Sequence, residues 1–362
     1  MNEILAVAVN ELVTDAILDR AYSWICSQRK DAHHNNSVWD LRFNWIQLKS
    51  ELQHKLLTGN YRFSPLRRFK INDEFISSWD AMDALVLKAL SITLQPLFSI
   101  SEFPHCTHLK GAGGIHAAIR QVHQKASQYH HVLKSDAYHY YESIDHSILM
   151  ALMKKKLNCP VLLHLIEQYC QRLETREGHY YHFRQGIPMG CPLSPLVAAL
   201  YLQPLDDAFA KSGFYVRFMD DWIVMVKTKH QLRKIIKQTY IILDRLKLKM
   251  HPDKTFFGCI KKGFDFLGVH FCGAPEIAKT CIENHRTKLA QRYAQGASTA
   301  CIGHYIDRWT SWCKGVLRCC SIDTLLLIPM EATREAPADH MGQPKETTNE
   351  QSFYRRSITT KR

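Results

Sequence analysis

Three aspartates that border apolar segments are the residues whose type and spacing could support chemistry. Asp220 and Asp221 stand side by side between the apolar runs YVRFM and WIVMV, and Asp136 ends the run VLKSD. Adjacent carboxylates between apolar strands repel each other, and a bound cation relieves that repulsion. Carboxylates at neighbouring strand ends can hold two Mg²⁺ ions about 3.5–4 Å apart, an arrangement that serves phosphoryl transfer. The pattern therefore predicts a two-metal site.

The aspartate pair also has a simpler interpretation as a hairpin turn, because aspartate is a common turn residue. Four further blocks follow Asp136 in a fixed order, and this order favours chemistry over the plain turn. The blocks are QGIPMGCPLSPL at 185–196, FMDD at 218–221, HPDKT at 251–255 and GFDFLG at 263–268.

Asp136 and the four blocks together resemble the successive palm motifs of reverse transcriptases, in particular the bacterial enzymes related to group II intron proteins. The resemblance covers roughly residues 35–320. It implies an α+β right-hand polymerase fold, with fingers, a palm built on an antiparallel sheet, and a helical thumb. It also implies an RNA-directed DNA polymerase that extends a primer with dNTPs by two-metal phosphoryl transfer.

The resemblance assigns roles to the acidic residues and to one lysine. It makes Asp136 and Asp220 ligands of both Mg²⁺ ions and Asp221 the third carboxylate, with Mn²⁺ as a substitute metal. Lys254 matches a lysine proposed to protonate the leaving pyrophosphate or bind its charge, although a plain surface lysine is the alternative. Phe218 stands where the family usually has the tyrosine of a Tyr-x-Asp-Asp motif.

A nucleotide pocket is implied by the same comparison. Tyr141 matches the aromatic steric gate that leaves no room for a 2′-hydroxyl, and a core aromatic is the alternative. Its neighbours Tyr138 and Tyr140 are expected to be core residues. Gln185 and Gly186 resemble residues that line this pocket, where glycine permits close backbone approach.

The fingers depart from the family pattern. Relatives carry an Asp-Arg pair where this chain has Asp83 followed by Ala84. If the fingers still contact the triphosphate, other basic residues must do so. The alternative is that these basic residues are simply solvated on the surface. The candidates are Arg67, Arg68, Lys70 and Lys110.

Hydrophobic periodicity outlines the elements that must position these residues. Helices are expected at 38–57, 81–98, about 115–128, about 229–246 and 302–317, a strand at 131–137, a hairpin at 215–226 and a strand pair around Gly263. The expected division is an N-terminal region with fingers at 1–130, palm at 131–275, helical thumb at 276–330 and a polar, mobile tail at 331–362. Within it, 266–268 resembles the primer-grip turn.

Composition sets broader limits. The 362 residues carry 47 Lys and Arg against 34 Asp and Glu, a net charge of +13 that suits an anionic partner. Basic residues recur at 62–70, 154–156, 227–237, 247–262 and 355–362, which favours a long polyanion. No apolar run is expected to reach the roughly 18 residues of a membrane span, and the N-terminus lacks a signal-peptide pattern. The 12 cysteines are dispersed, so we expect reduced thiols, a cytoplasmic protein and no membrane partner.

Two weaker clusters are better explained as packing or surface residues. Zinc at the C-terminal cysteines is disfavoured because they lack paired CxxC spacing and Cys313 falls on an apolar helical stripe. The histidine pairs at 33–34 and 130–131 are expected to be surface or packing residues rather than ligands. The cysteines and the histidine near them are Cys301, His304, Cys313, Cys319 and Cys320.

The expected role is that of a stand-alone bacterial enzyme that works with a dedicated noncoding RNA in antiphage defence. Its partners would be an RNA template and a cDNA product. Three alternatives stay open: a retroelement enzyme, a group II intron-derived splicing helper that mainly binds RNA, and an RNA-dependent RNA polymerase. Three intact acids argue against a pure binding protein, and Tyr141 argues against RNA synthesis.

Overall fold

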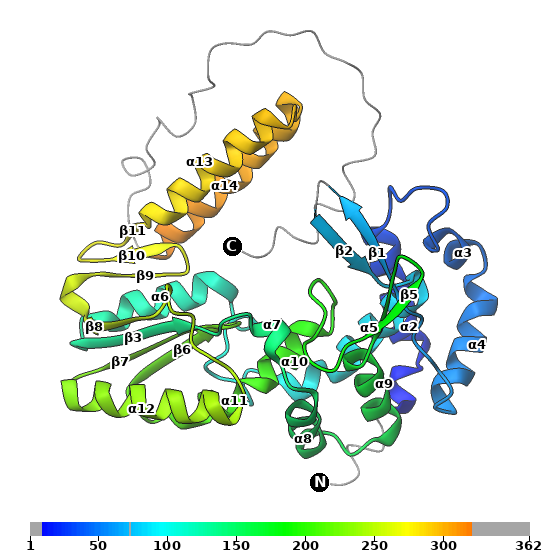
Figure 1. Ribbon diagram of the computed structural model, residues 1–362, viewed down its shortest axis with the longest axis horizontal. Helices are drawn as coiled ribbons and strands as arrows, with labels where there is room; N and C mark the ends of the chain where they lie inside the picture. Colours follow the sequence, from blue (N-terminus) through cyan, green and yellow to red (C-terminus); the bar gives the residue numbers. More distant parts are fainter. Residues whose placement is uncertain (1–8, 72–73, 321–362) are drawn as a thin grey trace.

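The computed structural model describes residues 9–71 and 74–320, with backbone alone at 70, 71, 74, 75 and 319. The predicted tail at 331–362 and the last part of the predicted thumb lie outside this range. Helices and largely antiparallel sheets alternate along the chain, which confirms the α+β class (Figure 1). Helices with one four-stranded sheet form one end of the molecule. Another four-stranded sheet, called the central sheet below, forms the other end with its own helices.

The central sheet is antiparallel throughout. Its strands, in spatial order, are β6 (Phe214–Phe218), β7 (Asp221–Val226), β3 (His131–Asp136) and β8 (Phe256–Cys259). The register between β3 and β7 places Asp136 directly opposite Asp221. The predicted strand and hairpin are thereby confirmed, and pairing brings together acids 85 residues apart in the sequence numbering (221 − 136).

Side chains alternate between the two faces of this sheet. On β7, Trp222 and Val224 face α12 (Lys229–Arg245), whereas Ile223 and Met225 face the layer that contains α6 (Gly114–Ala126). Asp221 is in phase with Ile223, so Asp221 and its cross-strand partner Asp136 lie on the α6 face. Figure 1 shows α12 along the opposite side of the sheet. Both helices confirm the predicted periodic segments.

The N-terminal half packs around one strongly apolar helix. This helix, α5 (Ala81–Leu94), continues into η1 (Gln95–Phe98), and their 18 residues have a mean hydropathy of 1.3. The expectation that no apolar run reaches membrane-spanning length was therefore wrong. Two thirds of this segment is buried inside the fold (67%), as expected for a helix that is apolar on every side because protein surrounds it.

Neighbouring helices complete this half. The segment predicted as one helix over 38–57 is broken at Asn44, whose side chain donates to Asp40 at 2.7 Å. The helices here are α2 (Asp15–Gln28), α3 (Val38–Phe43), α4 (Trp45–Leu57), α8 (His146–Lys156) and α9 (Pro160–Cys170). The short helices α7 (Tyr140–Ser143), α10 (Ser194–Tyr201) and α11 (Gln203–Phe209) connect them to the central sheet.

A second sheet sits above these helices in the order β2-β1-β4-β5. Its strands are β1 (Leu66–Ile71), β2 (Glu74–Ser78), β4 (Leu173–Arg176) and β5 (His179–His182). No strand was predicted at β5, because all four of its residues are exposed and show no hydrophobic alternation. The chain therefore returns to the N-terminal sheet within the range predicted as palm, and the domain boundaries stay predictions.

A small sheet and a helical pair form the C-terminal part of the described chain. The strands are β9 (Phe264–Phe266), β10 (Val269–Phe271) and β11 (Glu276–Ile277), and the helices are α13 (Lys279–Ala294) and α14 (Thr299–Cys319). Cys313 and Val316 are buried against α6, whereas Arg308 and Lys314 are exposed, which confirms the predicted apolar stripe. Figure 1 shows the pair projecting from the α6 side of the central sheet.

Candidate active site

The turn between β6 and β7 holds Asp220 at its tip. Phe218 pairs with Asp221, so Met219 and Asp220 alone form the loop. Met219 has a φ of +57°, in a region where a two-residue hairpin usually places glycine. Such a backbone costs about 1–3 kcal/mol and persists only where surrounding contacts hold it. The strained residue directly precedes the first aspartate of the pair.

Asp136 lies beside this turn and is almost fully buried, with 3% of its surface exposed. Its Oδ2 accepts a hydrogen bond from Lys254 Nζ at 2.6 Å. Its Oδ1 is buried and has no hydrogen-bond partner among the described residues. Among the described residues, one oxygen of this carboxylate is therefore buried without a hydrogen bond to offset its desolvation.

The pKa of Asp221 is strongly raised. Burial, followed by the charges of Asp220 and Asp136, raises its pKa from 3.8 to about 7. Lys134 and Lys254 oppose the shift without cancelling it. The acidic cluster therefore repels itself in the absence of a cation, as the sequence predicted.

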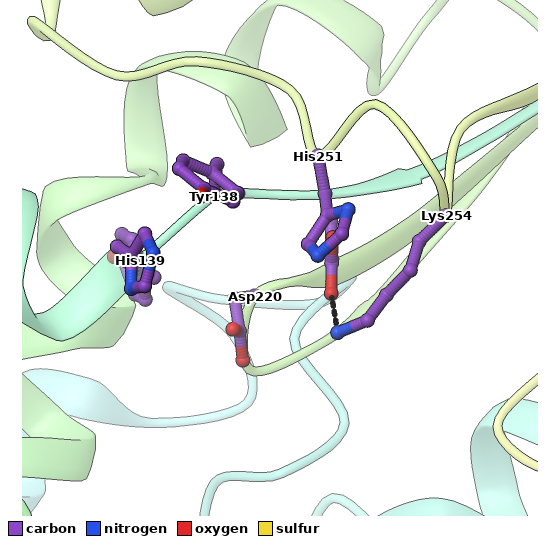
Figure 2. A pocket seen from close by; sticks show the side chains of 8 residues that line it. Tyr138, His139, Asp220, His251 and Lys254 are labelled. Atoms are coloured by element: carbon purple, nitrogen blue, oxygen red, sulfur yellow. Dashed lines mark hydrogen bonds and ion pairs between the residues drawn. The ribbon is translucent and has the colours of Figure 1, made fainter.

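A cavity of 210 Å³ opens in front of these residues. It is lined by Asp136, Ala137, Tyr138, His139, Tyr140, Asp220, His251 and Lys254. Figure 2 shows the Asp220 carboxylate and the Lys254 amine on the same side, with His251 above them and Tyr138 and His139 across the space. Asp221 sits next to Asp136 on the sheet and does not line the cavity.

Sequence reasoning missed several of these lining residues. His251 begins the HPDKT block, and its N–H donates to the Asp136 carbonyl at 2.9 Å, while its ring contacts Tyr138. Tyr138 is 41% exposed, so the expectation that it is a core residue was wrong. Tyr140 is buried as expected, and its hydroxyl donates to the Ala198 carbonyl. Proximity in sequence to Asp136 and Lys254 was the available signal.

The acids suit a divalent ion, although no ligand set is preformed. Within residues 9–71 and 74–320, no three His, Cys, Asp or Glu side chains are arranged to hold a metal. The ammonium group of Lys254 occupies one oxygen of Asp136, where it supplies the positive charge that a cation would bring. Among the described residues Asp136 Oδ1 has no partner, and burial followed by the charges of Asp220 and Asp136 raises the pKa of Asp221, so a bound cation would stabilise the ionised acids. Hard oxygen ligands of this kind fit Mg²⁺ or Mn²⁺.

The structure brings together the residues predicted for the nucleotide pocket. Gly186 has a φ of +80°, and a Cβ there would lie 2.9 Å from the Glu142 carbonyl oxygen, so only glycine fits. Ile187 N–H donates to the Tyr141 carbonyl at 2.8 Å, and Gln185 Nε2 donates to the Ser143 carbonyl at 3.1 Å. The Tyr141 side chain is 5% exposed and packs edge-on against Tyr140, outside the cavity lining. Its gating role stays a prediction.

Of the basic residues predicted for the fingers, those whose side chains the structure describes do not line the cavity. Arg67 is exposed on β1, and Arg68 Nε lies 3.8 Å from Oε1 of Glu174, a buried acid that also accepts from Arg176. Lys110 is exposed and does not line the cavity, and the side chain of Lys70 lies outside the described residues. Contact of these residues with a triphosphate therefore stays a prediction that needs the fingers to approach the palm.

Asp83, at the departure from the family pattern, has a structural role. It accepts hydrogen bonds from the Tyr61 hydroxyl at 2.6 Å and from Ser64 N–H at 2.9 Å. Burial raises its pKa to about 6, against the lowering effect of these hydrogen bonds. The residue fastens the start of α5 to the segment that leads into β1.

The predicted primer-grip turn lies against α14. Leu267 and Gly268 both have positive φ, and a Cβ on Gly268 would lie 2.8 Å from Cη2 of Trp312. Phe266 is fully buried beneath the turn. The backbone of this turn is therefore pressed against the helical pair, which links it to the position of α14.

An antiparallel sheet that carries three acids and a lysine beside one polar cavity defines the palm of a nucleotidyl-transferring polymerase. The family model described as "Reverse transcriptase (RNA-dependent DNA polymerase)" matches residues 63–271, more than half of the chain. The chain belongs to this reverse transcriptase family. The predicted resemblance, fold class and enzyme class are confirmed at that level.

Individual relatives are distant. The chain is 23% identical over 264 residues to Protein YkfC of Escherichia coli K12, and the match covers 60% of this chain and 69% of YkfC. It is 24% identical over 171 residues to the group II intron-encoded protein LtrA of Lactococcus lactis subsp. cremoris, 45% of this chain and 28% of LtrA. A chain of a partial Cas6-RT-Cas1–Cas2 complex is similar over 65% of this chain and 42% of its own length, with 21% identity and a TM-score of 0.41.

Proposed function

We propose that the chain extends a primer 3′ end with dNTPs on an RNA template, by phosphoryl transfer assisted by two divalent ions. The observation that carries this proposal is the cavity in which Asp136, Asp220 and Lys254 converge, with one buried Asp136 oxygen that has no partner among the described residues. Membership of the reverse transcriptase family supports the same reaction.

Asp136, Asp220 and Asp221 would hold the ions, with Mg²⁺ as the expected metal and Mn²⁺ as a substitute. When bound, such ions neutralise charge on the reacting phosphate and lower the pKa of the attacking hydroxyl. Lys254 brings a positive charge and a proton to the same cavity, where it stabilises the leaving pyrophosphate. Tyr141 and Gly186 would restrict the space beside the sugar and so favour deoxynucleotides.

The test compares acidic residues within one region of the fold. Asp136→Asn and Asp220→Asn should each lower dTTP incorporation on a poly(rA)–oligo(dT) substrate by about 10²–10³-fold, the usual scale for removing a group that stabilises transition-state charge. Asp253→Asn is the matched control, because Asp253 is exposed in the HPDKT block and does not line the cavity. Full activity in the Asp136→Asn/Asp220→Asn double variant would contradict the proposal.

For the biological role, we propose that the enzyme works with a noncoding RNA in antiphage defence, by analogy with its family. The similarity to a group II intron-encoded protein favours a second candidate, a retroelement enzyme or an RNA-binding splicing helper. Sequencing the RNA and cDNA that copurify with the chain tests the RNA partner. Equal plaque counts with and without the gene, across a broad phage panel, would contradict the defence role.

A further inference from the structure

The strained turn that carries Asp220 is held from both sides by side chains. Met219 N–H donates to Nδ1 of His108 at 3.0 Å, and the Met219 carbonyl accepts from Nη1 of Arg217 at 2.8 Å. These are the two peptide groups that flank the left-handed residue. Together they determine the direction in which the backbone enters Asp220.

Arg217 is a rigid support because it is fully buried. It forms an ion pair with Asp206 and also donates to the Ala199 carbonyl at 3.2 Å. Tyr215 donates to the same Asp206 at 2.6 Å, so the acid accepts from two buried residues of β6. One side of the turn is thereby fixed to α10 and α11.

His108 reaches the other side of the turn from a segment remote in sequence. Residues 105–108 run beside β6: Arg217 N–H donates to the His105 carbonyl at 2.8 Å, and Thr107 N–H donates to the Arg217 carbonyl at 2.9 Å. The Thr107 hydroxyl donates to that carbonyl as well, at 3.1 Å. The backbone next to His108 is therefore anchored, and its ring lies edge-on to Phe218.

One ring tautomer satisfies the contacts of His108. Nδ1 must present a lone pair to Met219 N–H, so the ring hydrogen belongs on Nε2. Nε2 lies 3.2 Å from the Pro195 carbonyl and donates to it, while Cys106 Sγ lies 3.3 Å from Nδ1. Pro195 lies in the first turn of α10. His108 therefore joins the Asp220 turn to the start of α10.

We propose that His108 is a positioning residue that sets the Asp220 carboxylate for divalent-ion binding by fixing the backbone of Met219. His108 does not line the cavity, so it acts through the turn and not on substrate. The proposal rests on the proposed function for its kinetic consequence. Its consequence for metal binding does not need catalysis.

The experiment uses the full chain and measures Mn²⁺ binding alone, by calorimetry and electron paramagnetic resonance, beside primer extension. His108→Phe keeps a ring of similar size without the acceptor. It should weaken Mn²⁺ binding and lower kcat about tenfold to a hundredfold, the usual effect of losing a group that orients a metal ligand. His108→Asn places an amide oxygen near the Nδ1 position and should restore most of both. His230→Phe is the control, because His230 is exposed on α12 and does not line the cavity, and it should match wild type.

The outcomes distinguish the positioning role of His108 from the proposed polymerase function. Wild-type Mn²⁺ affinity in His108→Phe would overturn the positioning role. Equal defects in His108→Asn and His108→Phe, in step with lost thermal stability, would also overturn it, because the residue would then be merely structural. If His108→Phe does not fold, His108→Asn should bind Mn²⁺ more tightly than His108→Gln, and equal affinities count against the role. A Mn²⁺ effect without primer extension in wild type would support the role and contradict the proposed function.

Discussion

At the scale of single residues, the site is a group of acids whose negative charges are only partly balanced by Lys254. Asp136 keeps one buried oxygen without a partner among the described residues and shares the other with Lys254. Lys254 is therefore close to both the acids and the cavity, and its charge competes with any cation that binds Asp136.

Asp221 should make the metal-free protein less stable as pH rises. Its pKa is raised from 3.8 to about 7, mainly by burial, so the native state binds this proton more tightly than the unfolded chain. The resulting stabilisation is present below about pH 4 and is lost as pH rises through about 7, up to about 4 kcal/mol in all. Denaturation in chelator should show this slope in wild type.

Asp221→Asn should lack that component of the slope and should unfold at higher denaturant than wild type at pH 8 without metal. Asp253→Asn serves as the control, since Asp253 is exposed. Parallel pH profiles for Asp221→Asn and wild type would show that Asp221 is already ionised across this range.

Tyr141 should control the choice of sugar through its ring. Tyr141→Val should raise ribonucleotide incorporation relative to deoxynucleotide incorporation by about tenfold to a hundredfold, the scale on which a shaped pocket discriminates a small group. Tyr141→Phe keeps the ring and should behave as wild type. The measurement is kcat/KM for dCTP and CTP on one template. Unchanged discrimination in the valine variant would assign Tyr141 to the core, in keeping with its 5% exposure.

At the scale of elements, turns with positive φ are held by residues from other segments of the chain. Met219 depends on His108 and Arg217, and Gly186 depends on the backbone of Glu142. Gly268 shows the same dependence on α14, because its turn touches Trp312. The geometry of each turn therefore follows from a partner distant in sequence.

Gly268→Ala should destabilise the packing of the primer-grip turn against α14. The new Cβ would lie 2.8 Å from Trp312, and the residue already has a φ of +82°. We expect a loss of about 2–3 kcal/mol in the free energy of unfolding, from strain and overpacking together. Gly273→Ala is the matched control, because Gly273 has a φ of +77° and, among the described residues, nothing lies within 4 Å of the position its Cβ would take. Equal losses in both variants would remove Trp312 from the explanation.

At the scale of the whole molecule, the chain has a net charge of +13, whereas its candidate active site is acidic. The basic segment at 227–237 falls largely on α12, on the face of the central sheet opposite the acids. Arg308 and Lys314 are exposed on α14, which projects from the same side as the acids (Figure 1). Positive charge on α14 should therefore matter more for template binding than positive charge on α12.

Charge reversal should separate the two surfaces. Arg308→Glu/Lys314→Glu should weaken binding of an RNA–DNA duplex about tenfold or more and reduce the slope of log affinity against log salt by about one for each phosphate that is no longer neutralised. Lys234→Glu/Lys237→Glu on α12 changes the net charge equally and should leave both quantities near wild type. Fluorescence anisotropy over a salt series measures both. Equal weakening by the two pairs would mean that only net charge matters.

The sequence by itself determined the acids, the lysine and the order of the motifs. Strand–turn–strand signals are local, so the hairpin at Asp220 and the strand that ends at Asp136 could be predicted from neighbouring residues. Helices α6, α12 and α14 followed from periodicity because each has one buried face. Strand β5 could not be predicted, since an exposed strand at a sheet edge carries no hydrophobic alternation.

Only the tertiary structure decided what meets at the site. His251 and Tyr138 line the cavity, and His108 reaches Met219 across 111 residues, because strand pairing and loop packing join segments that no sequence spacing relates. Arg68 pairs with Glu174 rather than lining the cavity, because β1 lies beside β4 in the second sheet. Residue types determine which chemistry is available, and long-range packing determines which groups come close enough to perform it.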